Sequence, residues 1–349
     1  MGSLDIQAAH PLADRAGVGP VKAVAPMAGG ANNRVFRLDA AAGTFLLKSY
    51  FRHPDDPRDR LGTEFAFSRF AWESGVRCIP QPLACDPAVG LGLFEFINGQ
   101  SLRGTSIGDV AVDQAIDFYR TLNRAKDRSA AATLPRASES CFSLDDHFAT
   151  VGRRVERLKA VAVGDAVDLA AASFIESELA PAWGQVLATA RTAAAAAGLR
   201  PDHPLDPADR CLSPSDFGFH NALLAADGRL RFIDFEYAGW DDPSKLICDF
   251  FCQPAVPAPI SAFDRFAAAV AAQLPDPALH VARATLLLPV YRVKWVCIML
   301  NEFLPVGGSR RAFSGTAAEL EARKADQLTK ARAALAAVLS SNTPTRKVA

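Results

Sequence analysis

The sequence has no surplus of either charge, since its 349 residues include 38 Lys and Arg and 38 Asp and Glu. A chain without a basic excess has no general attraction to nucleic acid or to an anionic membrane surface. It also has no long uninterrupted apolar run: the most apolar stretch, near 284–300, contains Pro289, Arg292 and Lys294 and is expected to be a core helix. We therefore expect neither nucleic acid nor a membrane as a partner, and the oligomeric state stays open.

Paired cysteines and a leader segment are missing as well. The seven cysteines are scattered, odd in number and include no C-x-x-C pair. Cys248 and Cys252 lie one helical turn apart without a neighbouring histidine pattern, so free thiols in a reducing cytoplasm are favoured over a metal site. Residues 1–17 lack the basic stretch and apolar run of a secretory signal. We expect a cytoplasmic protein.

What is present begins with a β-rich segment. Residues 21–51 contain three strand-like runs separated by glycine-rich turns. A helical pattern follows over about 60–74, and Gly75 is expected to end this helix. Two further strand-like runs end at the turn Asn98-Gly99. This order predicts a small antiparallel sheet with one helix.

After residue 99 the pattern becomes helical, with one β-hairpin embedded in it. Helices are expected near 109–125, 142–160, 165–197, 261–274, 279–303 and 316–340. The runs NALL and LRFIDF flank Asp227-Gly228, a strong hairpin turn signal. The predicted fold class is α+β with two lobes: an extension at 1–20, a β-rich lobe at 21–98, a helical lobe at 99–340 and a tail at 341–349.

The chemistry is concentrated around this hairpin. Asp216 and Asn221 are five positions apart just before the first hairpin strand, and Asp234 falls at the end of the second. Because the open ends of a hairpin lie about 5 Å apart, Asn221 and Asp234 should face one point. An amide oxygen and a carboxylate suit Mg²⁺, and Asp216 could then serve as the catalytic base for an acceptor hydroxyl.

Taken alone, D-x4-N is weak, because Asp and Asn are common turn residues. The order of the motif, the hairpin with its Asp-Gly turn and the apolar strand ending in Asp-Phe-Glu is much more specific.

A second set of residues lies in the β-rich lobe. Lys48 sits in the apolar strand FLLKSY and needs an anion if it is buried, and Glu64 on the predicted helix could supply one. Such a pair directs a lysine to nucleotide phosphates. The alternative is an edge-strand lysine that points to solvent. Gly29 and Gly30, in the segment that continues to Asn33, either form a simple turn or a loop whose backbone N–H groups meet phosphate.

With these residues in place, the chain resembles the aminoglycoside phosphotransferase and choline kinase family, relatives of the protein kinases. The resemblance covers about residues 22–305 and includes GGANNRVFRL, LLKSY, LFEFINGQSL, SDFGFHN, FIDFEYAGWDDPSKL and ICDFF. It implies a bilobal protein-kinase-like fold, with ATP and Mg²⁺ as cofactors.

The resemblance also implies a role for each matching residue. Lys48 would contact the nucleotide phosphates and Glu64 would hold Lys48, while the backbone at Glu95 and Ile97 would bind adenine. The remaining positions would be Asp216 as catalytic aspartate, Asn221 and Asp234 as magnesium ligands, and Asp249 as a support of the catalytic loop. One position departs from the pattern: Pro214 stands where the family often has a histidine that supports this loop, and His220 does not occupy that position.

The acceptor site is less defined. Trp240, Asp241 and Asp242 could form an acidic, aromatic pocket for an amine, as in the choline and ethanolamine kinases that this segment resembles. Alternatively, Trp240 packs in the helical lobe and the aspartates cap a helix at Pro243. Further candidates lie on the apolar helix near 284–303, where a basic lining would favour an anionic sugar-like acceptor: Arg292, Lys294, Trp295, Asn301 and Glu302.

The sequence therefore predicts an enzyme that transfers the γ-phosphoryl group of ATP to a hydroxyl of a small metabolite. The acceptor would be an amino alcohol, a sugar or an aminoglycoside-like molecule. The alternative is a nucleotide-binding pseudokinase with a regulatory role. A protein kinase is disfavoured, because no A-P-E segment or activation loop follows Asp234.

Overall fold

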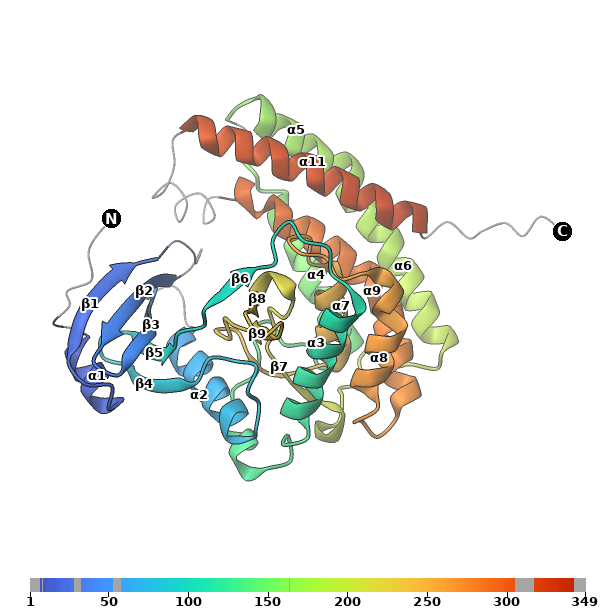
Figure 1. Ribbon diagram of the computed structural model, residues 1–349. Helices are drawn as coiled ribbons and strands as arrows, with labels where there is room; N and C mark the ends of the chain where they lie inside the picture. Colours follow the sequence, from blue (N-terminus) through green and yellow to red (C-terminus); the bar gives the residue numbers. More distant parts are fainter. Residues whose placement is uncertain are drawn as a thin grey trace.

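The computed structural model describes residues 7, 9–27, 33–52, 58–162, 164–304 and 317–341. The N-terminal part is a five-stranded antiparallel sheet of order β1-β2-β3-β5-β4, seen at the left of Figure 1 together with two helices. Its elements are α1 (His10–Arg15), β1 (Val21–Pro26), β2 (Asn33–Ala40), β3 (Gly43–Tyr50), α2 (Arg60–Glu73), β4 (Pro82–Asp86) and β5 (Leu91–Glu95). The predicted antiparallel sheet is confirmed.

Helix α1 lies within the segment 1–20, which the sequence analysis treats as an extension. Its Leu12 and Ala13 are buried in one cluster with Phe36, Leu38 and Leu47 of the sheet. The helix is short, so its stability comes from this packing rather than from its own hydrogen bonds. The sheet is covered on this side by residues from outside the predicted lobe.

Helix α2 joins the sheet to the helical part. It begins after Asp59, whose carboxylate accepts the Gly62 N–H at 2.9 Å, and ends where Gly75 takes a φ of 92°, a backbone angle that favours glycine. The centroid of its Phe65 ring lies 6.0 Å from that of Phe94 in β5. The Phe67 centroid lies 5.3 Å from that of Phe235 in the C-terminal part. The helix is therefore apolar on two sides, because each side is buried against a different neighbour (Figure 1).

The C-terminal part is mostly helical, as predicted. Its helices are α3 (Asp109–Asn123), α4 (Leu144–Leu158), α5 (Ala166–Phe174), α6 (Ala180–Ala196), α7 (Pro243–Cys252), α8 (Phe263–Ala271), α9 (Pro277–Met299) and α11 (Ala317–Ser341). A π-helical turn, Ile175–Leu179, joins α5 to α6. Short 3₁₀ turns lie at Ser129–Thr133, Pro207–Asp209, Phe219–Asn221, Ile260–Ala262 and Leu300–Phe303.

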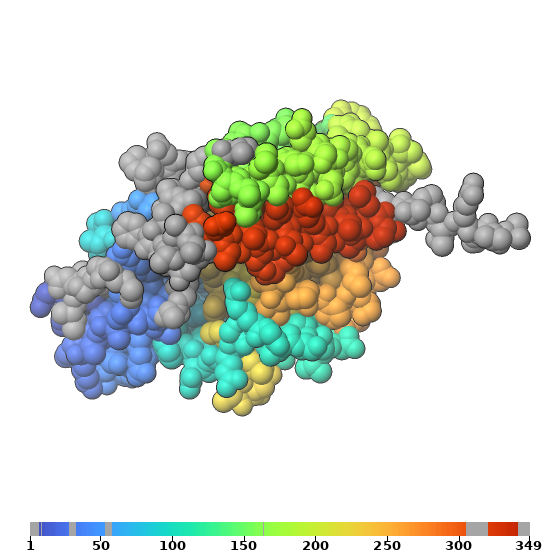
Figure 2. All heavy atoms as spheres, turned by 90° about the horizontal axis from the view of Figure 1, so that it is seen from above, coloured from blue at the N-terminus to red at the C-terminus, as the bar shows by residue number. Residues whose placement is uncertain are grey.

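Helix α9 is the centre of this part. The segment Pro277–Phe303 is long and apolar enough to cross a membrane by length and composition, and it is the one such segment among the described residues. In the fold it packs against α4, α6, α7, α8 and α11, which agrees with the predicted core helix. Helix α11 crosses beside α5 and α6 on the face shown in Figure 2.

Two small sheets lie next to the segment that carries Asp216 and Asp234. Strand β6 (Gly99–Ser101) pairs with β8 (Ala222–Ala225), which pairs with β9 (Leu230–Phe232). A separate ribbon pairs β7 (Cys211–Ser213) with β10 (Gly239–Asp241). The predicted hairpin is confirmed, and the strands β7 and β10 bring the segments before Asp216 and after Asp234 to one place.

Candidate active site

The loop that carries Asp216 is tightly turned. The Asp216 N–H donates to the Pro214 carbonyl at 2.9 Å, and Ser215 between them has a φ of 66°, a strained angle for a non-glycine residue. The Ser215 N–H donates to Ser213 Oγ at 3.0 Å. Such strain persists only where the surroundings fix it, and here the strand β7 and the phenylalanines that follow do so.

The hairpin brings Asn221 and Asp234 to one end, as the sequence predicts. The Ile233 N–H donates to the Asn221 carbonyl at 2.9 Å, so Asp234 is the next residue beyond this pair. Asp234 has a φ of 69°, which turns it away from the strand direction. Asn221 donates its Nδ2 to the Asp216 carbonyl at 3.0 Å and to Asp216 Oδ2 at 3.3 Å. Its amide oxygen is thus left to act as the acceptor.

Lys48 lies on the central strand β3, not on an edge strand, and it is buried. Its Nζ donates to both oxygens of Glu64 at 2.8 Å and to Asp234 Oδ1 at 2.9 Å. The Tyr50 hydroxyl also donates to Glu64, at 2.7 Å. The structure therefore brings the lysine and glutamate together as predicted, and it places the same lysine against the predicted metal ligand.

The electrostatics follow from this grouping. Burial alone would lower the pKa of Lys48, but the Asp234 and Glu64 carboxylates outweigh it and raise that pKa above its usual value. Burial raises the pKa of Glu64 despite the opposing Lys48 charge. For Asp216, burial is outweighed by the hydrogen bond and charge of His220 and by Asn221, so the pKa of Asp216 is below its ordinary value. Asp216 is therefore ionised at neutral pH.

The donor set of Asn221 and Asp234 fits Mg²⁺, because an amide oxygen and a carboxylate are hard ligands and leave positions for water and phosphate. The Asp234 side chain is 37% exposed and can reach such an ion. Within the described residues, no group of three or more His, Cys, Asp or Glu could hold a metal ion. These two residues would hold the ion with help from the nucleotide.

The predicted nucleotide contacts are placed in part. Gly29 and Gly30 lie outside the described residues. Asn33, at the start of β2, is buried and donates its Nδ2 to Glu236 Oε2 at 2.6 Å across the two lobes. Glu95 ends β5 and its N–H donates to the Gln81 carbonyl at 2.8 Å, while Ile97 follows between β5 and β6.

The predicted support residue Asp249 stands at the centre of a buried charge cluster. Its carboxylate receives Lys294 Nζ at 2.8 Å and the Trp295 indole N–H at 2.9 Å, and Lys245 Nζ lies 3.7 Å away. Lys245 in turn reaches Ser215 Oγ at 3.4 Å. The path from Asp249 to the catalytic loop thus runs through Lys245, and the Trp295 indole N–H is directed at Asp249.

Two other predicted acceptor residues do not reach a ligand. Asp242 is fully buried and caps α7 by accepting the Ser244 N–H at 2.7 Å, so its prediction as an acceptor contact is wrong for a physical reason: no solvent reaches it. The Trp240 indole N–H donates to the Ala131 carbonyl at 3.0 Å, and its ring packs against the core. For both residues the structure matches the alternative of packing and capping.

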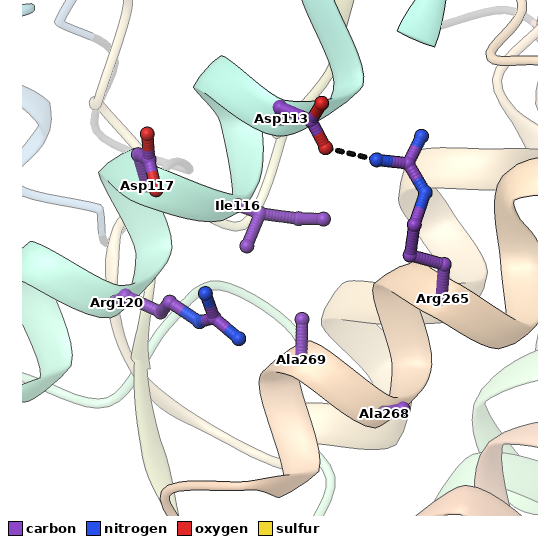
Figure 3. A pocket seen from close by; sticks show the side chains of 7 residues that line it. All are labelled: Asp113, Ile116, Asp117, Arg120, Arg265, Ala268 and Ala269. Atoms are coloured by element: carbon purple, nitrogen blue, oxygen red, sulfur yellow. Dashed lines mark hydrogen bonds and ion pairs between the residues drawn. The ribbon is translucent and has the colours of Figure 1, made fainter. Parts of the chain in front are cut away.

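The surface also has two shallow hollows elsewhere. One, of about 540 Å³, lies between α3 and α8, where Arg265 pairs with Asp113 (Figure 3). The other, of about 630 Å³, is lined by apolar side chains of α8 and α9, including Val281. Neither hollow contains a residue of the catalytic loop, the hairpin or the sheet, so neither is the candidate active site.

Several site residues were not found from the sequence, although signals for them exist. Tyr50 is two positions after Lys48 on one strand, and this spacing places both on one face. Lys245 is four positions from both Asp241 and Asp249, the spacing of neighbours on a helix. Glu236 follows Asp234 by two positions, but its contact with Asn33 spans 203 positions and has no local signal.

This arrangement can be compared with known proteins. The sequence profile of the phosphotransferase enzyme family matches residues 23–280, which is most of the chain. The chain belongs to this family. No curated protein matches the sequence. The matched segment contains Lys48, Glu64, Asp216, Asn221 and Asp234.

Solved phosphotransferase structures share the fold. A choline/ethanolamine kinase family protein from Mesorhizobium loti is 20% identical with a TM-score of 0.56, covering 95% of this chain and 98% of that one. Spectinomycin phosphotransferase, solved with ADP and spectinomycin, is 13% identical with a TM-score of 0.60, at 96% and 99% coverage. A choline kinase from Streptococcus pneumoniae is 13% identical with a TM-score of 0.57, at 95% and 100%. At these identities the likeness shows the fold, which confirms the predicted bilobal kinase-like architecture.

Proposed function

We propose that this phosphotransferase moves the γ-phosphoryl group of ATP, with Mg²⁺, to a hydroxyl of a small metabolite. The observation that carries the proposal is the convergence of two groups on one point. Lys48, held by Glu64, reaches Asp234 from the sheet, and Asp216 and Asn221 reach the same hairpin end from the helical lobe. Residues 186 positions apart meet there.

Each residue has a separate task in this proposal. Lys48 binds the nucleotide phosphates, with Glu64 and Tyr50 fixing its position. Asn221 and Asp234 hold the metal ion, which when bound neutralises charge on the transferred group. The backbone near Glu95 and Ile97 binds adenine.

Asp216 accepts the proton of the acceptor hydroxyl in this proposal. Its lowered pKa keeps the carboxylate free of a proton at neutral pH, and its side chain is 38% exposed, so an acceptor can reach it. Lys245 and Asp249 support the loop through the contact between Lys245 Nζ and Ser215 Oγ.

Three exposed carboxylates near the loop support an amine-bearing acceptor in this proposal. The side chains of Asp216, Asp234 and Glu139 are 38, 37 and 46% exposed. The Glu139 loop lies beside the catalytic loop, where Ser215 Oγ donates to the Ser138 carbonyl at 3.5 Å. The cations that pair with the local carboxylates are Lys48, Lys245, Lys294 and Arg154, and none is more than 14% exposed. A positively charged acceptor is attracted to such a surface.

Replacement of Asp216 tests the proposal directly. We expect Asp216→Ala to lower turnover by roughly 10²- to 10⁴-fold, the contribution of a general base, while ATP still binds. ATP consumption should be measured with choline, ethanolamine, spectinomycin, hygromycin B, sugars and nucleosides. Asp202→Ala is the matched control, because Asp202 is exposed and pairs with Arg200 at the surface.

The metal assignment has its own test. Asn221→Ala and Asp234→Ala should each weaken ATP binding in the presence of Mg²⁺, measured by calorimetry, and change it little in EDTA. Equal binding by both variants and the unaltered protein would contradict the assignment. Tight Mg-ATP binding without turnover on any acceptor would favour the pseudokinase alternative instead.

A further inference from the structure

His220 is a partly buried polar residue that has no role in the proposed function. Its Nε2 lies 3.1 Å from Asp216 Oδ1, and its side chain is 12% exposed. Its Nδ1 is buried without a hydrogen-bond partner in the part of the chain that the structure describes. Of the two neutral tautomers, only the one with the proton on Nε2 donates to Asp216, and it also leaves no unpaired N–H on Nδ1. The ring therefore makes one polar contact, and that contact is to the candidate base.

The backbone around His220 is fixed by two aromatic anchors. Phe217 packs against Phe118 at 5.3 Å and Phe250 at 5.1 Å, and Phe219 packs against Phe250 at 5.1 Å. Both phenylalanines are buried. Because Phe217 directly follows Asp216 and Phe219 directly precedes His220, the packing of both rings in the core restrains the backbone between the carboxylate and the imidazole.

Gly218 provides the space that the ring occupies. A Cβ at Gly218 would lie 2.7 Å from His220 Nδ1 and 2.9 Å from Cε1, too close for any real contact. The φ of 171° at Gly218 is an extended angle open to any residue, so glycine is needed here for space and not for its backbone freedom. Gln253 lies on the other side of Gly218, and its Cγ would be 3.1 Å from the added carbon. The Gln253 side chain is held in place because its Oε1 accepts hydrogen bonds from the Ala255 and Val256 N–H groups. The ring could not move aside without breaking its contact.

We infer that His220 is a positioning residue for phosphoryl transfer, and that Gly218 lacks a side chain so that the His220 ring can hold Asp216. This inference rests on the proposed function, in which Asp216 is the base. The imidazole N–H fixes Oδ1 while the Asn221 amide approaches Oδ2 at 3.3 Å. Pro214, two positions before Asp216, cannot hold the Asp216 carboxylate, because its side chain has no hydrogen-bond donor. The hydrogen bond to the carboxylate comes instead from His220, four positions after Asp216.

The experiment compares His220→Leu with the conservative His220→Gln. Turnover is measured as ATP consumption with ethanolamine, choline, spectinomycin or hygromycin B, or as Mg²⁺-dependent ATP hydrolysis if none is accepted. His220→Leu should lower kcat by about 10- to 100-fold, as expected for a misplaced reacting group, with an unchanged KM for ATP. His220→Gln should retain most of kcat, since its amide N–H can replace Nε2–H. His203→Leu, at an exposed histidine, is the matched control.

A double substitution tests the role of Gly218. Gly218→Ala should lower kcat as His220→Leu does when His220 is present, because the added carbon displaces the ring. In a His220→Ala background the same change should have little further effect, since no ring is left to displace. Equal losses in both backgrounds would show that Gly218 acts by another route and would overturn its part of the inference.

The outcomes separate this inference from the proposed function. If Asp216→Ala abolishes turnover but His220→Leu and Gly218→Ala keep kcat, the positioning role is overturned and Asp216 remains the base. If Asp216→Ala keeps turnover, the proposed function itself fails. Should His220→Leu not fold, His220→Gln and Gly218→Ala decide, together with imidazole NMR of the six histidines: a His220 ring without a proton on Nε2 would overturn the contact.

Discussion

At the scale of single residues, the buried carboxylate of Asp242 is compensated by two cationic partners, His147 and Arg283. His147 Nε2 lies 3.0 Å from Asp242 Oδ2 and its Nδ1 lies 2.7 Å from the Tyr291 hydroxyl. Arg283 donates to the same Asp242 oxygen at 2.6 Å. Burial of Asp242 is outweighed by the Arg283 and His147 charges, so the pKa of Asp242 is well below its usual range. Removing one partner would leave a buried charge uncompensated.

This pairing predicts a pH dependence of stability. Burial would lower the pKa of His147, but Cys141 and Asp242 outweigh it and raise the pKa from 6.5 to about 9. Because the folded state binds the proton more tightly, this stabilisation is complete below pH 6.5 and is lost as the pH rises through 9. The loss in the free energy of unfolding should be on the order of 3 kcal/mol. Urea unfolding at pH 6, 7.5 and 9 measures it.

The control for this prediction is His147→Gln, which cannot take up a proton there. Its unfolding free energy should be lower than that of the unaltered protein at pH 6 and should change less between pH 6.5 and 9. Parallel curves for the two proteins would show that another group is responsible for the pH dependence.

At the scale of secondary structure, the ribbon of β7 and β10 decides where the two loops of the site meet. Gly239 in β10 has a φ of 156°, and an added Cβ would lie 2.6 Å from the Ala137 N and still closer to the Pro135 carbonyl. Trp240 exchanges hydrogen bonds with Pro135 and Ala137 in this place, at 2.9 and 3.0 Å. The backbone segments are too close together for any side chain at Gly239.

Gly239→Ala should therefore lower the free energy of unfolding by about 1–3 kcal/mol, as expected for overpacking. Gly184→Ala is the matched control with the opposite sign: Gly184 lies in α6 with open space around its added carbon. It should gain about 0.5–1 kcal/mol, because alanine is the better helix former. Chemical denaturation of both variants checks the pair, and equal effects would contradict the steric account.

The elements themselves were predicted to different degrees. Patterns of apolar residues predicted α2, the helices near α3, α4 and α9, and the hairpin around Asp227-Gly228, because those signals are local. The ribbon of β7 and β10 was not predicted, since each strand has three residues and pairs with a distant partner. Helix α1 was also missed, because its six residues are stabilised by the sheet that they cover.

At the scale of the whole molecule, α2 packs against both lobes, and we expect it to couple their unfolding. Its Phe67 and Phe70 belong to the core of the helical part, together with Phe235. Glu64 on the same helix holds Lys48. Side-chain hydrogen bonds also cross between the lobes, including those from Lys48 to Asp234 and from Asn33 to Glu236. A change in this helix should therefore be felt by both lobes.

Phe67→Ala tests this coupling. Phe67 is fully buried, so its truncation should cost about 3–5 kcal/mol, and it should also weaken ATP binding because Glu64 is three positions away. Calorimetry should show one unfolding transition that moves as a whole to lower temperature. Val110→Ala, at an exposed residue of α3, should leave both properties unchanged. Two separate transitions in Phe67→Ala would mean that the lobes unfold independently.

The sequence by itself determined the order of the elements, the hairpin and the set Lys48, Glu64, Asp216, Asn221 and Asp234, because periodicity, turn chemistry and motif spacing are local properties. The convergence of that set is a consequence of the fold that those local signals specify. Only the tertiary structure decided how the remaining polar residues are placed. It buried Asp242, turned Trp295 toward Asp249 and folded His220 back onto Asp216, since each depends on contacts between surfaces that no local pattern records.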